Sequence, residues 1–135
     1  MREIKFRAWH IERKFMGHCL EVSLLNGYAV IDLDNIGNMG GSETFRFKEC
    51  SFFKNAPIEI KLMQYTGLKD CNGKEIYEGD IIELNNGYLF NVEWHQEECK
   101  FALFHNCCIC WCFDEAGEMK VIGNIYENQE LLENE

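Results

Sequence analysis

The stretch GDIIELNNGYLFNVEWHQEECKFALF, residues 79–104, decides the fold class of this chain. Short segments of alternating apolar and polar residues are separated here by turn-forming residues at Gly79-Asp80, Asn85–Gly87 and 96–98. Such segments at close spacing are typical of antiparallel β-strands. The same rhythm continues through a turn at 114–118 to MKVIGNIY, residues 119–126. The sequence therefore predicts that the chain from Gly79 onward forms a small closed β-barrel of about five strands.

The preceding half also reads as strands, and no long helical period is present. EIKFRAW (3–9) alternates, and residues 19–33 predict a hairpin in which Asn26-Gly27 forms a tight type I′ turn. A glycine-rich loop is expected at 34–42, and a strand from 43 to 53 would turn Phe45, Phe47 and Cys50 inward. A further strand is expected to start at Pro57, and Asn128 is expected to cap one helical turn in the tail. We therefore predict a mainly β protein with little helix, an N-terminal β lobe at 1–64 and a barrel lobe with its tail at 65–135.

Composition and charge exclude several classes of protein. The 135 residues are 47% hydrophobic and 27% charged, and the longest apolar run, Cys107–Phe113, is too short to span a membrane. The N-terminus does not resemble a signal peptide, so we expect a cytoplasmic protein with reduced thiols. Residues 1–74 hold 11 Lys/Arg and 9 Asp/Glu, whereas residues 75–135 hold 2 and 14, a net charge of −12. An acidic C-terminal half repels phosphate backbones and suits either a solvated surface or a basic protein partner.

The segment FHNCCICWCF, residues 104–113, concentrates half of the eight cysteines. As a strand it would place Cys107, Ile109, Trp111 and Phe113 on one face and Cys108, Cys110 and Cys112 on the other. The first face is large and apolar, so it is expected either to close the core of one monomer or to form an interface. Ile109, Trp111 and Phe113 are therefore the candidate interaction surface, including the surface of a homo-oligomer.

A metal site or a reactive thiol in this segment is disfavoured. The candidate ligands are His105, Cys108, Cys110 and Cys112, but residues two apart on a strand are about 6.5–7 Å apart and do not converge as zinc requires. A reactive thiol needs a nearby cation, and residues 101–119 contain no Lys or Arg. We expect no metal and no cofactor.

Three ordered stretches carry a family resemblance: MREIKFRAW at the start, LMQYTGLKDCNGKEIYEGDII (62–82) in the middle and VIGNIYEN (121–128) near the end. Together they resemble the YopX family, small proteins encoded by phages and prophages. The resemblance implies a mainly β architecture with an SH3-like barrel in the C-terminal part, and it brings no biochemical activity or catalytic residues. Gln129 departs from the proline that often follows NIYEN in the family.

The middle stretch contains carboxylates near glycines but not a calcium loop. Asp70, Asn72 and Glu75 lack the glycine and glutamate spacing of an EF-hand. Asp70 and Asn72 are expected to satisfy backbone groups in a tight turn, and Tyr65 and Tyr77 to pack between the two lobes.

Three functions are weighed on these grounds. The favoured hypothesis is a non-enzymatic accessory protein that binds a host or phage protein, because His10, His18, His95 and His105 are scattered outside any catalytic motif. An alternative is nucleic-acid binding through the basic N-terminal lobe, whose cations are Arg2, Lys5, Arg7, Arg13 and Lys14. A second alternative is a zinc protein centred on residues 105–112.

Overall fold

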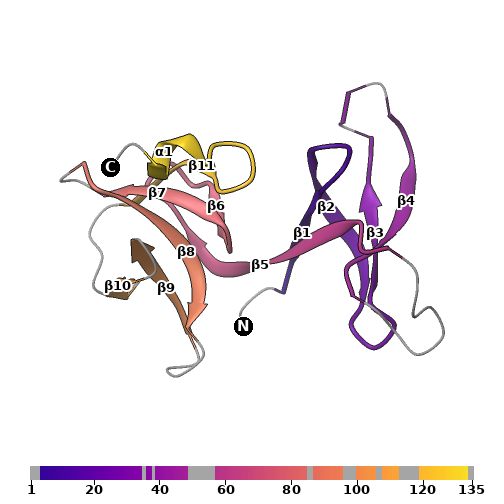
Figure 1. Cartoon of the computed structure of the whole chain (residues 1–135), viewed down its shortest axis with the longest axis horizontal. Coiled ribbons are helices and arrows are strands. Elements are labelled where there is room, and N and C mark those ends of the chain that lie inside the picture. Colours follow the sequence, from indigo (N-terminus) through magenta and orange to yellow (C-terminus); the bar gives the residue numbers. More distant parts are fainter. Residues whose placement is uncertain are drawn as a thin grey trace. The chain divides into compact units, whose positions relative to one another are not determined.

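The structure is a computed structural model that describes residues 4–34, 36–37, 39–48, 57–84, 87–95, 100–105, 108–112 and 119–133. The side chains of residues 95, 105, 108–112 and 133 are not among those described. Within these ranges the chain forms eleven antiparallel β-strands and one short helix, α1 (Glu130–Glu133). The expectation of a mainly β protein with little helix is confirmed. The chain divides into two compact units inside the long strand β5 (Ile60–Lys69), between Gln64 and Tyr65 (Figure 1).

The unit formed by Ile4–Gln64 is an antiparallel meander that ends on β5. Its strands are β1 (Phe6–His10), β2 (Phe15–Ser23), β3 (Tyr28–Asp32) and β4 (Ser42–Arg46), in the spatial order β4-β3-β2-β1-β5. Alternate residues of these strands turn to one face and bury a core of Ala8, Ala29, Ile31, Leu33, Phe45 and Ile60. Phe45 is 2% exposed and Phe47 packs against the same core, as the alternation predicts, while Cys50 lies outside the described residues.

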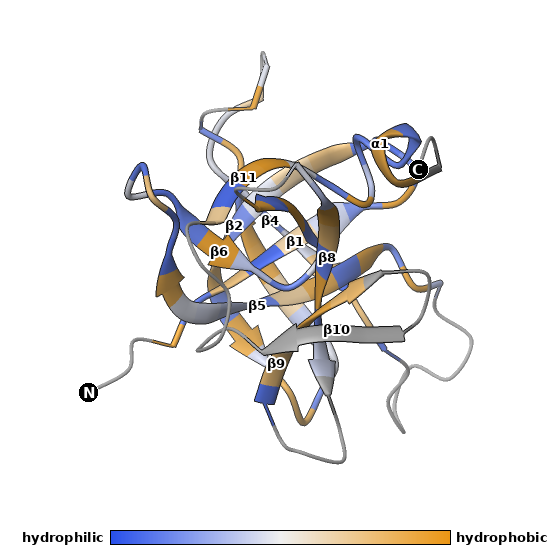
Figure 2. Ribbon diagram, turned by 90° about the vertical axis from the view of Figure 1, so that its left-hand side faces the viewer, coloured by the Kyte–Doolittle hydropathy of each residue, from blue (hydrophilic) through white to orange (hydrophobic). Residues whose placement is uncertain are grey.

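The unit that begins at Tyr65 holds a five-stranded sheet. Its strands are β7 (Asp80–Leu84), β8 (Leu89–His95), β9 (Lys100–His105), β10 (Cys108–Cys112) and β11 (Met119–Asn124), in the order β10-β9-β8-β7-β11. The short strand β6 (Glu75–Tyr77) pairs with β5. Consecutive residues are buried in several of these strands, such as Ile81 and Ile82 in β7 and Phe101, Ala102 and Leu103 in β9, and Figure 2 shows the hydropathy along the ribbon. The core contains Ile76, Ile82, Leu84, Phe90, Val92, Phe101, Leu103 and Val121.

All five strands expected after Gly79 are present, but the sheet does not close into a barrel. Within the described residues β10 pairs only with β9, and β11 pairs only with β7. The outer edge of β11 is occupied by the turn that precedes β6: the Cys71 N–H donates to the Met119 carbonyl at 2.9 Å, and the Val121 N–H donates to the Asp70 carboxylate at 3.0 Å. Because these backbone groups of β11 are already bonded, they are not open to a closing strand.

The predicted β2–β3 turn and the predicted start of β5 differ from the structure. The β2–β3 connection is a four-residue turn, 24–27, rather than a two-residue type I′ turn, because only Gly27 and not Asn26 has a positive φ. Strand β5 begins at Ile60 instead of Pro57, and Glu59 instead bonds the end of β4 through its N–H to the Arg46 carbonyl at 2.9 Å.

The helical turn in the tail exists as α1, but the Asn128 side chain does not cap it. The Asn128 Oδ1 accepts the N–H of Asn124 at 3.2 Å, and its backbone carbonyl accepts the N–H of Leu131. In the described part of the chain, no helix has the length and apolar character needed to cross a bilayer.

Candidate functional site

The Asp70 carboxylate organises the turn between β5 and β6. Its Oδ1 accepts the N–H groups of Asn72 at 2.9 Å and Lys74 at 2.8 Å, and its Oδ2 accepts the N–H of Val121. Burial raises the pKa of Asp70, but these three donors and the charge of Lys74 outweigh burial and hold the pKa below its ordinary value. The predicted backbone role of Asp70 is confirmed, and both of its carboxylate oxygens bond backbone N–H groups.

The EGD segment that follows β6 is also structural. Gly79 has φ +88°, its N–H donates to Val92 at 2.8 Å, and its carbonyl accepts the N–H of Ile125. Asp80 is 1% exposed and accepts the N–H of Tyr77 at 2.8 Å. The rings of Tyr65 and Tyr77 pack at a tilt of 38° with centroids 5.4 Å apart, and both residues belong to the unit that begins at Tyr65. The middle stretch therefore joins strands of one unit instead of exposing reactive groups.

Leucines at the β2–β3 turn form the most exposed apolar feature of the Ile4–Gln64 unit. Leu24 is 58% exposed and Leu25 is 87% exposed, in turn positions where polar residues, Gly or Pro are usual. Leu20, at 63% exposure, is the extra residue of a β-bulge in β2, since Cys19 pairs with Ile31 and Glu21 with Val30. We call Leu24 and Leu25 the leucine tip.

Cationic side chains lie at the base of the leucine tip. The Arg46 guanidinium donates to the Asn26 carbonyl at 3.3 Å. The Gly27 carbonyl accepts the N–H groups of Phe47 at 2.8 Å and Lys48 at 3.3 Å, and a Cβ on Gly27 would lie 2.7 Å from the Lys48 side chain. The apolar leucine tip therefore lies next to two cationic residues, Arg46 and Lys48.

Sequence reasoning missed the leucine tip because it assigned Leu24 and Leu25 to the end of a strand. The available signal was two leucines directly before Asn26-Gly27, where a longer turn would expose both. The candidates it selected, Ile109, Trp111 and Phe113, have side chains outside the described residues. The backbone of residues 108–112 does form a strand, with a register shift between Ile109 and Trp111 that interrupts the regular pairing with β9.

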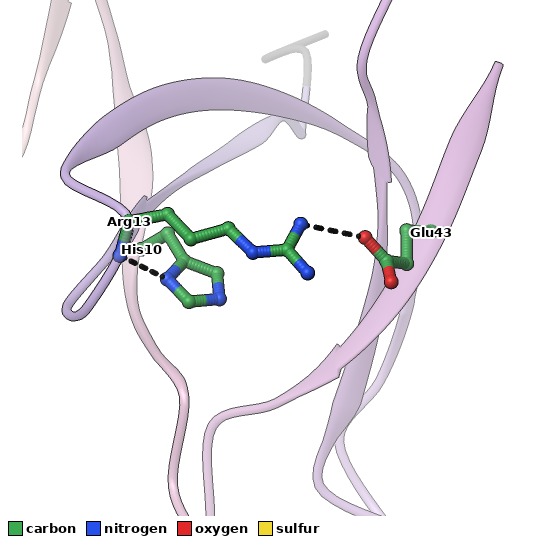
Figure 3. A network of polar contacts seen from close by, with 3 residues as sticks. All are labelled: His10, Arg13 and Glu43. Carbon is green, nitrogen blue, oxygen red and sulfur yellow. Dashed lines mark hydrogen bonds and ion pairs between the residues drawn. The ribbon is translucent and has the colours of Figure 1, made fainter. Parts of the chain in front are cut away.

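A second polar cluster lies at the β1–β2 turn. His10 is 4% exposed, and its Nδ1 accepts the N–H of Arg13 at 3.0 Å (Figure 3). The Arg13 guanidinium reaches Glu43 of β4 at 3.0 Å and lies 5.6 Å from the centroid of Phe45. The His10 ring stacks on Phe15 at 5.2 Å and meets Phe45 edge-on at 4.7 Å. These contacts connect the turn to the core.

The arginines of the nucleic-acid alternative are not gathered into a phosphate-binding surface. Arg7 is 8% exposed, and Arg13 is paired with Glu43. Lys5 is half-buried, Lys14 is exposed, and Arg2 lies outside the described residues. A backbone-tracking groove needs exposed, unpaired cations along one face, so the described residues do not favour this alternative.

Two cysteines, Cys19 and Cys71, have side chains that the structure describes. Burial raises the pKa of Cys19 to about 12, so its thiol stays protonated at neutral pH. Cys71 is exposed, and both thiols are free. Among the side chains that the structure describes, no three His, Cys, Asp or Glu residues gather as a metal site would require. The candidate ligands His105, Cys108, Cys110 and Cys112 have side chains outside that set.

Comparisons with known proteins identify a family and a fold. A family model described as YopX protein matches residues 5–133, nearly the whole chain. The crystal structure of protein EF1440 from Enterococcus faecalis is similar, with 28% sequence identity and a TM-score of 0.58, covering 98% of this chain and 99% of that one. A search of curated proteins finds no match. These findings confirm the resemblance carried by the three sequence stretches, and they supply no activity.

Proposed function

This chain belongs to the YopX family, and from that premise we propose that it is an accessory protein that acts by binding another protein rather than by catalysis. The leucine tip carries the proposal. Two adjacent leucines held in a turn present apolar area that would gain about 2–4 kcal/mol from burial against a partner. Hydrogen bonds from Phe47, Lys48 and Arg46 fix the shape of the turn in advance, which lowers the entropy cost of binding.

The chemistry around the tip indicates the kind of partner. An apolar end above Arg46 and Lys48 fits an apolar pocket whose rim carries carboxylates, because opposite charges across an interface steer association. The resemblance to proteins of phages and prophages supports a host or phage protein as the partner, met in the cytoplasm. Self-association through the same tip is the other protein–protein arrangement.

The finer architecture of the second unit is part of the proposal. Four consecutive strands, β7 to β10, form a meander, and β11 returns to pair with β7. This connectivity supports an SH3-like arrangement in which no strand pairs with the outer edge of β11 among the described residues, because the Asp70 turn bonds that edge.

The test is a comparison of binding by the full chain and by two variants. Tagged wild-type protein and the double variant Leu24→Ser/Leu25→Ser would be isolated from the producing cell, and the proteins recovered with each would be quantified by mass spectrometry. The affinity of each recovered partner would then be measured by calorimetry. The tip variant should weaken a true partner at least about tenfold, which corresponds to about 1.4 kcal/mol.

Leu68→Ser is the matched control, because Leu68 is 42% exposed and belongs to the other unit. It should leave affinity within about twofold. Equal loss in both variants, or equal binding by the tip variant and the wild type, would contradict the proposal. Sedimentation of the same three proteins reveals whether the occupant of the tip is a second copy of this chain.

A further inference from the structure

The two consecutive hairpin turns of the Ile4–Gln64 unit follow the same hydrogen-bond plan. In the β2–β3 turn, the Gly27 N–H donates to the Ser23 carbonyl at 2.9 Å, and the Asn26 N–H donates to the Ser23 hydroxyl at 3.2 Å. The last strand residue thus accepts twice, once with its backbone and once with its side chain. Short polar side chains such as serine often stabilise turns in this way.

The β1–β2 turn repeats this plan with histidine in the place of serine. The Lys14 N–H donates to the His10 carbonyl at 2.9 Å, and the Arg13 N–H donates to the His10 Nδ1 at 3.0 Å. An imidazole Nδ1 accepts a hydrogen bond only when it carries no proton. The first turn therefore depends on the neutral form of His10, whereas a serine hydroxyl accepts at any ordinary pH.

The surroundings of His10 oppose its charged form. The ring is buried between Phe15 and Phe45, and the Arg13 guanidinium is close by. Burial and then Arg13 lower the pKa of His10 from its ordinary value of 6.5, against weaker opposing effects of three carboxylates. Those carboxylates are Glu59 before β5, Glu12 in the turn and Glu43 on β4.

Once the imidazole is protonated, two backbone hydrogen bonds still hold the ends of the turn, from the Lys14 N–H to the His10 carbonyl and from the Ile11 N–H to the Glu59 carbonyl at 3.0 Å, but the middle of the turn is weakly held. Lys14 has φ +56°, a left-handed conformation that a side chain disfavours, whereas Gly27 takes φ +72° without that penalty. The Arg13–Glu43 ion pair joins side chains that are 48% and 45% exposed, where water screens the attraction. A protonated Nδ1 is itself a donor, so it could no longer accept the hydrogen bond from the Arg13 N–H.

We propose that the β1–β2 turn is an acid-sensitive latch, in which a proton taken up from solvent at His10 Nδ1 releases the Arg13 amide and lets Glu12 and Arg13, in the middle of the turn, move away from β4. The β2–β3 turn, built on Ser23, stays closed under the same conditions. Opening takes the Arg13 guanidinium away from Glu43 and from the Phe45 ring. The latch does not depend on the leucine tip or on any partner.

The test uses the wild-type chain with its second turn as an internal reference. NMR would follow the His10 ring and the amide exchange of Arg13 and Asn26 between about pH 5 and pH 8, with exchange corrected for intrinsic pH dependence. We expect His10 to titrate below 6.5 and the protection of Arg13 to fall at least tenfold as it does so. Asn26 should change less than twofold. Parallel changes at Arg13 and Asn26, or a His10 titration at or above 6.5, would overturn the latch.

Two variants separate the latch from a general loss of stability. His10→Asn places an uncharged acceptor near the Nδ1 position, so Arg13 should keep the same protection across the whole range. Lys14→Gly removes the energetic cost of the left-handed backbone conformation at this position. It should raise Arg13 protection severalfold at low pH, while the His10 titration remains. If Arg13 protection in His10→Asn keeps the wild-type pH dependence, the proposal is refuted. If His10→Asn does not fold, Lys14→Gly provides the test. Unchanged Arg13 protection at low pH in Lys14→Gly would contradict a strained turn that opens.

Discussion

Asp70 connects two places that are 51 residues apart in the sequence. One oxygen closes its own turn on Asn72 and Lys74, and the other accepts the N–H of Val121 in β11. The first role follows from the sequence, because aspartate before Asn-Gly commonly bonds the backbone of its own turn. The second depends on which strand arrives beside the turn, and no local pattern in residues 69–73 indicates that.

The Asp70→Asn substitution tests the double role. An asparagine can offer one carbonyl oxygen to Asn72 and Lys74, but its amide would present a donor to the Val121 N–H. We expect a loss of about 1–3 kcal/mol in the free energy of unfolding, measured in urea. Asn72→Ala is the control, because the Asn72 side chain is exposed and only its backbone contributes, so it should cost less than about 0.5 kcal/mol. Equal effects of the two substitutions would contradict this account.

At the scale of elements, the end of β11 depends on a contact between a glycine and an asparagine. The Asn124 N–H donates to the Asn128 Oδ1, and the Asn124 side chain accepts the N–H groups of Tyr126 and Glu127. A Cβ on Gly123 would lie 2.5 Å from the Asn128 Oδ1 and 2.7 Å from its Cγ. The GNIYEN segment therefore forms a compact unit in which Asn128 packs directly on the backbone of Gly123.

The Gly123→Ala substitution should displace Asn128 and break its bond to Asn124. We expect a loss of about 1–3 kcal/mol in thermal or urea unfolding. An Asn128→Gly background removes the Oδ1, the Cγ and also the Cβ, which lies 2.9 Å from the added methyl group, so the same substitution should cost at least about 1 kcal/mol less there. Additive costs in this double-mutant cycle would show that the clash does not determine the effect.

The strands were largely predictable, and their ends were not. Short apolar-rich runs separated by turn-forming residues identify β7, β8, β9, β10 and β11, because runs of this length and spacing are typical of antiparallel strands. The turn at 24–27 was placed too late, since Asn26-Gly27 also fits a tighter turn whose backbone angles only the structure distinguishes. The exposed leucines of the candidate site depend on that difference, which is why the sequence did not reveal them. The prediction of a closed barrel was wrong because residues 70 and 71 bond the edge of β11, a contact between distant segments that the local sequence pattern does not indicate.

At the scale of the whole molecule, two groups predict a two-step loss of stability in acid. The pKa of His10 is lowered in the folded state, so the folded chain binds fewer protons than the unfolded chain just below pH 6.5, and stability falls as pH drops through that window. The pKa of Asp70 is also lowered, so its contribution is complete above 3.8 and is lost as pH falls through the folded value. The first loss concerns the Ile4–Gln64 unit and the second the unit that begins at Tyr65.

Urea unfolding at a series of pH values measures both steps. The difference between wild type and His10→Asn should change between about pH 7 and pH 5, and the difference between wild type and Asp70→Asn only below about pH 4. Taking differences removes the contribution of the other carboxylates. A His10→Asn difference that stays constant from pH 7 to pH 5 would mean that the imidazole has the same proton affinity in folded and unfolded chains.

Strand β5 has a consequence for how the chain is made. During synthesis, β1 leaves the ribosome early and acquires β2, but its other edge waits for residues 60–64, which follow about 3–10 seconds later at about 5–20 residues per second. The same strand continues without interruption into the residues that pair with β6. Completion of the earlier ladder and nucleation of the later one are therefore consecutive events on a single extended segment, and a translational pause near this point would set the order in which the two halves mature.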